Sequence, residues 1–461
     1  MQTKSNLNKE LLHKYSVSIP RYTSYPTAPQ WKEGFTENDF LKINEEANIA
    51  KSPLSLYFHL PFCEEHCNFC ACNVVISKKK EIVGPYLARI IKEINYTGKL
   101  IRKERKVEQI HLGGGTPTFF SSDELSQLFG AIEQNFNLSD ACEIGIEVDP
   151  RVTKYEHIET LSQLGFNRIS MGIQDFDPKV QEAINRIQPY NETKELFTYA
   201  RDHGFVSINA DLIYGLPYQT LESFKRTIDL ILAINPDRIA LFHYAHLPEL
   251  LSHQAKYIEE KALPSSDVKI EIFQYAVDVL TKNEFVFIGL DHFAKENDEL
   301  AIARKNNTLH RNFQGYTTKS SCDLYGFGIT AISNIQNSFS QNLKKLNPYY
   351  EEVDKGKVPV FKGIYLNKDD MIRKEIIMKI LCNGVLLKDE IENKYKIEFN
   401  KYFLSELDKL KSLVADGLVE LHKNTINVTQ LGQFFLRNIA CVFDYYLNSS
   451  EGKQKIFSKS I

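Results

Sequence analysis

Strands and helices alternate between about residues 53 and 290, and this alternation is the feature that most restricts the fold. Apolar runs of strand length lie at 54–60, 107–112, 143–148, 168–173, 206–213, 238–244 and 285–290. Segments of helix length separate most of them, at 84–104, 122–136, 155–164, 192–203, 220–233 and 267–282. Such alternation is typical of βαβ units, so it predicts an α/β fold with a parallel sheet in a full or partial TIM-like (β/α) barrel. In such barrels the chemistry lies at the carboxyl ends of the strands.

Two segments of different character flank the predicted barrel, which with its mouth loops spans 51–364. Residues 1–50 form an N-terminal arm, in which Pro20–Ala28 holds two prolines and small hydroxyl residues and is therefore predicted to be extended. Residues 365–461 predict a mainly helical C-terminal domain that resembles a winged-helix module. Its expected elements are helices at 371–381, 402–414 and 430–447 and a hairpin at 418–421 and 425–428.

Composition excludes some classes of partner. The net charge is −3 and 43% of the residues are hydrophobic, which is ordinary for a soluble globular protein and argues against nucleic acid or a membrane surface. The N-terminus, Met1–Asn6, is polar, and no apolar run approaches the roughly 20 residues of a spanning helix. We therefore expect a cytoplasmic monomer.

Four of the eight cysteines lie within ten residues, Cys63–Cys72, directly after the first strand. Crowded thiols are ligands or redox groups more often than packing residues. A disulfide needs an oxidising compartment, which nothing in the sequence indicates, and a structural zinc usually draws on a second Cys-x-x-Cys pair, which is missing. An iron–sulfur cluster fits best. Four other cysteines are scattered among apolar neighbours and are expected to be buried: Cys142, Cys322, Cys382 and Cys441.

The spacing of Cys63, Cys67 and Cys70, with Phe69 before the third cysteine, resembles the C-x3-C-x2-C signature of radical S-adenosylmethionine (radical SAM) enzymes. The resemblance implies that these three cysteines hold one [4Fe–4S] cluster and that S-adenosylmethionine chelates its open iron. One electron then cleaves the cofactor to a 5′-deoxyadenosyl radical. Because a fourth ligand would close this site, we assign Cys72 a catalytic role instead.

Polar residues recur where the following strands end. Gly113–Gly115 follows the second strand and lets the backbone approach a ligand closely, although a tight turn is the plain alternative. Glu147, Gln174 and Asp211 lie in or at the ends of three successive strands. Burying such groups is unfavourable unless something binds them, so a shared ligand with hydroxyls and amines is the better explanation.

The run Pro20-Arg21-Tyr22-Thr23-Ser24-Tyr25-Pro26-Thr27-Ala28 resembles the N-terminal arm of oxygen-independent coproporphyrinogen III oxidases, and the similarity covers nearly the whole chain. It implies two S-adenosylmethionine molecules side by side. The first would contact Tyr57, Gly114, Glu147 and Ile332. The second would contact Gly115, Thr116, Gln174, Arg186, Asp211 and Ala245. Phe69 would also contact a cofactor, and the catalytic set would be Tyr57, His59, Cys72 and Gln314. Ala71 departs from the usual glycine of the cluster loop.

The resemblance implies oxidative decarboxylation of two propionates of coproporphyrinogen III, giving the vinyl groups of protoporphyrinogen IX in haem biosynthesis. An electron donor such as flavodoxin or ferredoxin would be needed. Arg21 and Arg311 are candidates for pairing with substrate carboxylates, with solvated arginine as the alternative. The irregular stretch 289–345 predicts a functional loop at the barrel mouth.

Two other functions remain open from the sequence. Related haem chaperones lack such an arm and a counterpart of Cys72, and they carry a Tyr-Trp pair in a His-Asn motif. In this chain the only tryptophan is Trp31, and the corresponding loop reads His310-Arg311-Asn312-Phe313. A radical SAM methyltransferase acting on haem is the second rival, and product analysis separates it from a decarboxylase.

Overall fold

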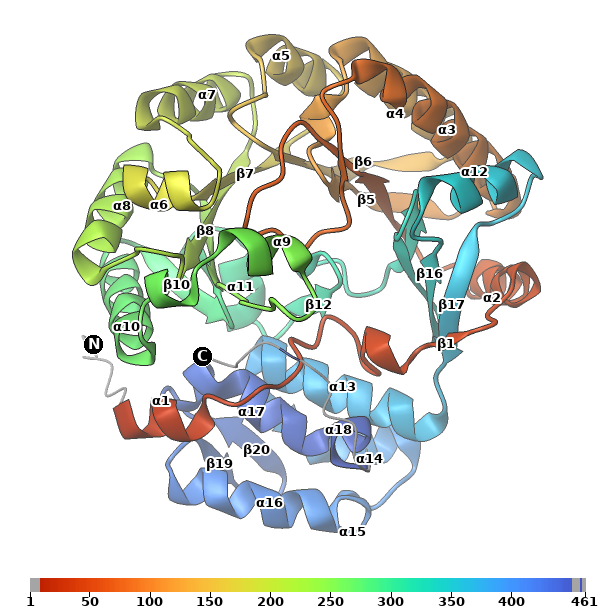
Figure 1. The fold of residues 1–461 in the computed structure, drawn as a ribbon. Coiled ribbons are helices and arrows are strands. Elements are labelled where there is room, and N and C mark those ends of the chain that lie inside the picture. The colour runs from red at the N-terminus through yellow and green to blue at the C-terminus, as the bar shows by residue number, and fades with distance from the viewer. Residues whose placement is uncertain (1–8, 450–456, 458–461) are drawn as a thin grey trace.

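The computed structural model describes residues 9–449 and residue 457 (Figure 1). Met1–Asn6, the start of the predicted arm and most of 450–461 lie outside the described residues. No helix among those described is long and apolar enough to cross a membrane.

A single sheet of 13 strands forms the centre of the molecule, in the order β1-β17-β16-β15-β14-β2-β5-β6-β7-β8-β9-β11-β10. Its parallel part consists of β2 (Leu54–Leu60), β5 (Lys106–Gly114), β6 (Asn137–Val148), β7 (Arg168–Gln174), β8 (Ser207–Tyr214) and β9 (Arg238–His243). The two ends of the order do not pair, so the barrel is partial. This confirms the expected α/β barrel.

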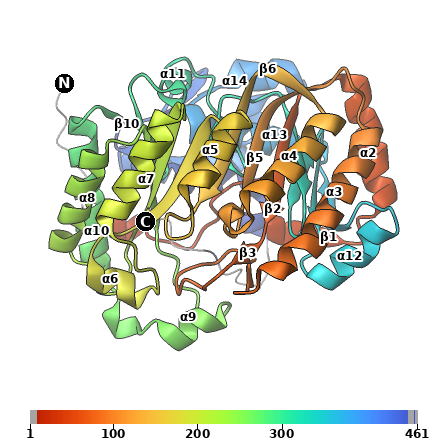
Figure 2. The same cartoon turned by 90° about the horizontal axis from the view of Figure 1, so that it is seen from above.

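Helices cover the outer face of these strands (Figures 1 and 2). They are α3 (Val83–Leu100), α4 (Ser122–Asn135), α5 (Tyr155–Gln163), α7 (Tyr190–Asp202), α8 (Leu221–Ile234) and α10 (Ser266–Lys282). Local sequence sets where some begin: Ser121 and Glu124 form a capping box at α4 that satisfies exposed backbone N–H groups. Their apolar faces pack against Val, Ile, Leu and Phe side chains of the strands in one continuous core.

The stretch 289–345 differs from the expected mouth loop. After β10 (Phe285–Gly289), β11 (His292–Lys295) turns back and inserts between β10 and β9, antiparallel to both, so β10 is not a parallel neighbour of β9. Farther on, β14 (Asp323–Phe327) pairs in parallel with β2, and β15 (Ile332–Ile335), β16 (Ser338–Asn342), β17 (Val360–Tyr365) and β1 (Lys32–Glu33) extend the sheet. Every residue of β14 is buried, which removes the alternation that would have revealed a strand.

A short hairpin, β12 (His310–Asn312) and β13 (Gly315–Thr317), closes the end of the barrel where the parallel strands begin. Gln109 near the start of β5 donates to Thr317 at 3.4 Å, and Lys319 pairs with Glu108 at 3.2 Å. Because β5 starts at the amino ends of the parallel strands, the hairpin lies at the floor of the barrel rather than its mouth. The prediction of a mouth loop is therefore wrong for this segment.

The arm packs largely on the C-terminal domain, while α2 (Glu37–Ala50) packs on the barrel. Tyr22 and Tyr25 are almost fully buried in the core of the C-terminal domain, and the Tyr22 hydroxyl donates to Asp444 at 3.0 Å. Helix α1 (Lys9–Tyr15) belongs to the same packing, below the barrel in Figure 1.

The C-terminal domain contains α13 (Lys368–Asn383), α14 (Lys388–Tyr395), α15 (Phe399–Tyr402), α16 (Leu404–Ala415) and the antiparallel strands β19 (Val419–Leu421) and β20 (Thr425–Val428). The last predicted helix, 430–447, is instead broken into a 3-10 turn (Gly432–Phe435), α17 (Leu436–Ala440), a second 3-10 turn (Cys441–Phe443) and α18 (Tyr445–Ser449). Its residues are buried on nearly every side, which one straight amphipathic helix does not allow. Of the scattered cysteines, Cys142 and Cys382 are buried and the other two are half-buried.

Candidate functional site

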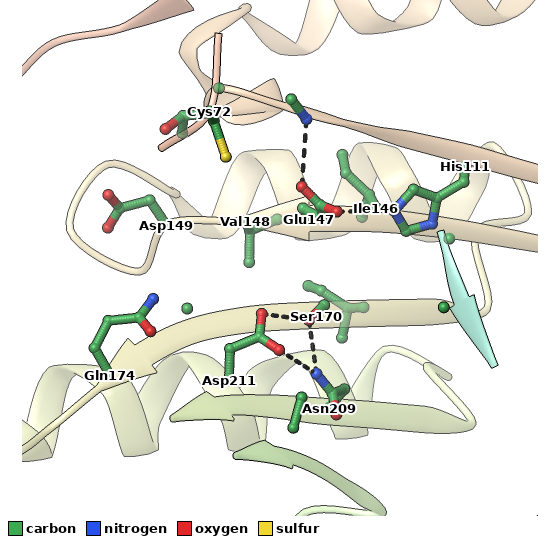
Figure 3. A pocket seen from close by; sticks show the side chains of 18 of the residues that line it. Cys72, His111, Ile146, Glu147, Val148, Asp149, Ser170, Gln174, Asn209 and Asp211 are labelled. Carbon is green, nitrogen blue, oxygen red and sulfur yellow. Dashed lines mark hydrogen bonds and ion pairs between the residues drawn. The ribbon is translucent and has the colours of Figure 1, made fainter. Parts of the chain in front are cut away.

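A cavity of about 660 Å³ lies inside the barrel, between the cysteine loop at the carboxyl ends of the strands and the β12–β13 hairpin. Its volume lies within the range of small-molecule and cofactor sites. Figure 3 shows side chains from successive strands pointing into it. Most of the residues selected from the sequence line this one space: Cys63, Cys67, Phe69, Cys70, Cys72, Gly114, Gly115, Thr116, Glu147, Gln174, Arg186, Asp211 and Gln314.

The cysteine loop is fixed from both sides. Asn68 donates its side-chain amide to the carbonyl of Ala183 at the end of α6 (Pro178–Ala183), at 3.0 Å. From the other side, His253 Nε2 of α9 (Ser252–Tyr257) lies 2.8 Å from the carbonyl oxygen of Cys70, and Gln254 donates to that of Phe69 at 3.1 Å. Helix α9 lies beyond the strand ends in Figure 2. These contacts hold the loop over the cavity.

The thiols of the three predicted metal ligands have different neighbours. Cys63 Sγ lies 3.3 Å from the hydroxyl of Thr116, and burial raises the pKa of this thiol to about 11. Cys67 Sγ lies 3.5 Å from a guanidinium nitrogen of Arg151 and 3.6 Å from one of Arg186. Both arginines also bind Asp149, at 2.7 and 2.8 Å. Positive charge beside a thiol favours the thiolate that metal binding requires.

The chemistry of the donor set fits an iron–sulfur cluster, because thiolates are its usual ligands. Cys63, Cys67 and Cys70 line the same cavity. That these three cysteines are the ligands stays a prediction.

The glycine run brings backbone to the cavity wall. Gly114 has φ +115°, and a Cβ atom on Gly115 would lie 2.6 Å from the carbonyl carbon of Pro61. Neither position accommodates a larger residue. A Cβ atom on Gly113 would lie 2.9 Å from the carboxyl group of Glu147. The run therefore brings its backbone close to Pro61 and Glu147 at the cavity wall, and its approach to a ligand stays a prediction.

Glu147 on β6 is held as an anion. Its Oε1 lies 3.2 Å from His111 Nε2, and its Oε2 accepts from the Gly114 N–H at 3.3 Å (Figure 3). Burial raises the pKa of Glu147, but the hydrogen bond and charge of His111 and the Gly114 N–H outweigh burial, so the pKa ends below its ordinary value. The side chain is deep in the protein yet 47% exposed, which means that its exposure is to the cavity.

For Asp211 on β8, the effects that raise the pKa outweigh those that lower it. It accepts from Ser170 at 2.9 Å and from Asn209 at 2.8 Å. Burial and the negative charge of Glu147 nevertheless raise its pKa to about 6. Of these two carboxyl groups, Glu147 is therefore the more readily ionised.

Gln174 and Arg186 complete this wall. Gln174 has φ +70°, an unusual conformation for a residue other than glycine, and it follows a bulge between Gly172 and Gln174 that interrupts the pairing with β8. Arg186 donates to the carbonyl of Gly172, and its buried Nε has no hydrogen-bond partner within the protein. Both side chains therefore have polar atoms available to a ligand.

The remaining predicted catalytic residues lie in or close to the cavity. The Tyr57 hydroxyl lies 3.1 Å from His59 Nδ1, and the Tyr57 ring is stacked with that of His111. His59 Nε2 lies 3.0 Å from the carbonyl oxygen of Asn73 in the cysteine loop. Both amide atoms of the Gln314 side chain are buried without a partner. Gln314 on the floor hairpin is thus the clearest unsatisfied polar group of the predicted set.

Two predicted cofactor residues lie away from this cavity. Ala245 lines a second, smaller cavity of about 320 Å³ formed with the arm and α10. Ile332 on β15 packs with Trp31 and Phe339. For these two positions the contact with a cofactor stays a prediction.

Arg21 and Arg311 lie near each other where the arm, the floor hairpin and α17 meet. Arg21 forms an ion pair with Asp291, and burial together with the charges of Arg437 and Arg311 lowers its pKa to about 9. Arg21 stacks on Phe242, which lines the main cavity. Two buried nitrogens of Arg311, Nε and Nη1, have no hydrogen-bond partner in the protein. Arg311 is 5% exposed and is therefore not the solvated surface residue of the alternative interpretation, whereas the Arg21 side chain is 33% exposed and held by its ion pair with Asp291.

The sequence analysis missed several residues that shape the site: His111, Asp149, Arg151, Ser170 and Asn209. The signal for Asn209 is visible in hindsight, because it precedes Asp211 by two positions on a strand and so faces the same side. Ser170 likewise precedes Gly172 by two positions on β7 and so faces the same side of the sheet. Asp149 and Arg151 follow β6 directly, where a barrel of this kind places its functional residues.

Comparison with known proteins agrees with this geometry. Residues 57–231 match the radical SAM superfamily and residues 366–435 match the HemN C-terminal domain. A protein of Synechocystis sp. named oxygen-independent coproporphyrinogen III oxidase is 45% identical over 98% of this chain and 97% of its own length. One of the same name from Pseudomonas aeruginosa is 43% identical over 95% and 96%. The solved structure of coproporphyrinogen III oxidase (HemN) from Escherichia coli, described as a radical SAM enzyme, has a TM-score of 0.92 and 41% identity, and the match covers 96% of this chain and all of that one.

Proposed function

This chain belongs to the oxygen-independent coproporphyrinogen III oxidase family of radical SAM enzymes, and we propose that it converts coproporphyrinogen III to protoporphyrinogen IX in haem biosynthesis. Two propionates are decarboxylated oxidatively to vinyl groups. The observation that carries the proposal is the convergence of Cys63, Cys67 and Cys70 with Glu147 and Asp211 on one cavity.

Membership of the superfamily implies a [4Fe–4S] cluster and S-adenosylmethionine. When bound, they would supply a 5′-deoxyadenosyl radical that takes a β-hydrogen from a propionate, and the substrate would then lose CO2 and pass one electron to an external electron acceptor. In our proposal, Cys63, Cys67 and Cys70 each provide one thiolate, and Arg151 and Arg186 balance the charge near Cys67. Three thiolates leave one iron open to S-adenosylmethionine.

We assign two molecules of S-adenosylmethionine to the cavity. Tyr57, Gly114 and Glu147 hold the first, with Ile332 as the least supported contact because of its distance from the main cavity. The second is held by Gly115, Thr116, Gln174, Arg186 and Asp211, with Ala245 at its outer side. Ionised Glu147 is suited to accept from an ammonium or a hydroxyl group, and Asp211 from hydroxyls.

In this proposal the remaining assigned residues orient the bound cofactor and substrate and exchange hydrogen bonds or protons with them. Phe69 lines the cavity from the cysteine loop, and the Tyr57–His59 contact fixes two polar groups beside Gly114. The Gln314 amide can donate to and accept from a ligand that reaches the floor. Cys72 also lines the cavity, and in our proposal it is not a cluster ligand and acts on the substrate.

Arg21 and Arg311 pair with substrate carboxylates in this proposal, since the substrate is a tetracarboxylate and buried guanidinium groups bind carboxylates strongly. The electron that cleaves S-adenosylmethionine comes from a donor such as flavodoxin or ferredoxin. The arm at 1–50, the barrel at 51–364 and the domain at 365–461 would act together, because Arg21 and Arg311 meet only where those parts are packed.

The test is anaerobic turnover of coproporphyrinogen III by the reconstituted enzyme, with products identified by mass spectrometry. The expected product is smaller than the substrate by two CO2 and four hydrogen atoms. Methyl transfer would add mass instead, and haem binding without turnover would indicate a chaperone. Either result would overturn the proposed function.

A further inference from the structure

Ser170 and Asn209 form a closed hydrogen-bond network with Asp211 on the cavity wall (Figure 3). Asn209 donates from its amide to Asp211 Oδ1 at 2.8 Å and to the hydroxyl oxygen of Ser170 at 2.8 Å. The Ser170 hydroxyl in turn donates to Asp211 Oδ2 at 2.9 Å. Each carboxylate oxygen therefore has its own donor, and the two donors are fixed to each other.

Strand register creates this network. Ser170 on β7 and Asn209 on β8 are paired in register, and Asp211 lies opposite Gly172. Because side chains on a strand alternate, Asn209 and Asp211 face the same side. A Cβ atom on Gly172 would lie 2.8 Å from Gln174 Nε2 and 3.1 Å from an Arg186 nitrogen, so the place opposite Asp211 has to stay free of a side chain.

Asp211 is otherwise in surroundings that favour its protonated form. It is half-buried at the cavity wall, inside the barrel, and Glu147 on β6 places a negative charge nearby, while Arg186 is the favourable charge that faces it. The arginines of the flanking strands are engaged elsewhere, Arg168 with Glu299 at 3.1 Å and Arg238 with Asp298 at 2.8 Å. The donors Ser170 and Asn209 lower the pKa of Asp211 and thereby offset part of this effect.

We propose that Ser170 and Asn209 are positioning residues that keep Asp211 ionised and oriented, so that its free lone pairs accept hydrogen bonds from the hydroxyl groups of a bound nucleoside. The inference rests on the assignment of Asp211 to the second S-adenosylmethionine. A protonated Asp211 presents a donor in place of an acceptor, and a misoriented one accepts at the wrong place.

The experiment uses the reconstituted, anaerobic holoenzyme and measures S-adenosylmethionine affinity and stoichiometry by equilibrium dialysis at pH 7.0 and pH 8.5. The variants are Ser170→Ala, Asn209→Ala and the nearly isosteric Asn209→Asp, which replaces a donor by a like charge. Ser207→Ala is the matched control, since this serine lines the same cavity on the same strand without contacting Asp211. Iron content is measured for each variant to confirm that the cluster is assembled.

We expect Ser170→Ala and Asn209→Ala to weaken the second binding event roughly 10-fold at pH 7.0, because each removes one donor from a carboxylate. At pH 8.5 the affinity should recover to within about threefold of the parent, since the carboxylate ionises again. Asn209→Asp should be the weakest binder at both pH values, and Ser207→Ala should stay within about twofold. The first binding event should not change.

Unchanged affinity in both alanine variants overturns the inference while the proposed function stands. An equal loss at both pH values overturns the role in ionisation, because a carboxylate that is ionised but misplaced binds equally poorly at both. Asp211→Ala serves as the reference: if this variant binds two molecules with parental affinity, the assignment of the cofactor to Asp211 fails first. The failure of the inference and the failure of that assignment are thus distinguishable.

Discussion

The cavity wall on β6–β8 and the junction of arm, hairpin and C-terminal domain both gather charged groups in buried positions, but they arise differently. On the wall, Glu147 and Asp211 come from β6 and β8, the two strands that flank β7, and their positions follow from a side-chain period of two. At the junction, Arg21 and Arg311 come from segments 290 residues apart, and only the packing of the whole chain brings them together. The wall is built by local geometry and the junction by tertiary contacts.

This difference suggests a division of labour. The wall with the cysteine loop has the polar groups to bind cofactors whether or not the junction is intact. The junction has buried cations near the cavity, beside Phe242 and His292, and would position the substrate. Changes on the wall should therefore affect cofactor binding, and changes at the junction should affect the coupling of cofactor cleavage to product.

The largest effect is expected from the cysteine loop. Replacing Cys63, Cys67 or Cys70 by Ser should abolish the [4Fe–4S] absorption and all cofactor cleavage, because a cluster with three protein ligands does not tolerate the loss of one. Iron analysis and 5′-deoxyadenosine release measure this. A variant with four irons per chain and normal cleavage would disprove the ligand assignment.

Cys72→Ser is the matched control within the same loop. It should keep its iron and its cofactor cleavage but lose porphyrinogen turnover, since Cys72 faces the cavity outside the ligand set. Loss of iron in this variant would make Cys72 a ligand.

The second effect concerns the junction. Arg21→Ala should assemble the cluster and cleave S-adenosylmethionine, yet lower decarboxylation on the order of 100-fold, because misplacement of about 1 Å at the reacting atoms has effects of that size. The ratio of vinyl product to 5′-deoxyadenosine is the measurement. A parental ratio, in this variant and in one lacking residues 1–30, would mean that the arm is only structural.

The third effect concerns the wall. Glu147→Ala and Asp211→Ala should each weaken S-adenosylmethionine binding roughly 30-fold, because each leaves ligand hydroxyl or ammonium groups unpaired. Equilibrium binding should show two molecules per chain in the parent. Glu147→Ala should weaken binding of the first molecule and Asp211→Ala binding of the second. One molecule per chain in the parent would remove the two-site arrangement.

The same contrast explains what could be predicted from the sequence. The first six predicted strands, most of the helices and the convergence of Glu147, Gln174 and Asp211 follow from periodicity and the barrel rule, and the structure places them accordingly. The seventh predicted strand exists as β10, but β11 separates it from β9. The insertion of β11 and the position of the β12–β13 hairpin at the floor could not be predicted, because strands of three or four residues are too short to show a period of two. The partners of Arg21 and Tyr22 depend on packing across the whole chain, which no local pattern encodes.

The smallest expected effect concerns Glu93, a buried carboxyl group elsewhere in the barrel that can be compared with Asp211 on the cavity wall. Glu93 on α3 is 3% exposed and accepts from the Gly328 N–H, the Asn342 amide and the Tyr349 hydroxyl, at 2.8, 2.8 and 2.6 Å. Its contacts are complete within the protein, whereas Asp211 faces a cavity. Burial raises the pKa of Glu93 from 4.5 to about 7, with the three donors opposing this only in part.

A raised carboxyl pKa means that the folded protein binds more protons than the unfolded chain between the two pKa values. The contribution of Glu93 to stability is therefore fully present below about pH 4.5 and is lost as the pH rises through about 7. Over that interval the change is on the order of 3 kcal/mol. Glu93→Gln mimics the protonated form and should unfold with less dependence on pH, so its urea midpoint should gain on the parent between pH 5.5 and 8. A constant difference between parent and variant would show that Glu93 is ionised throughout, and cofactor affinity should be unchanged in either case because Glu93 lies outside the cavity.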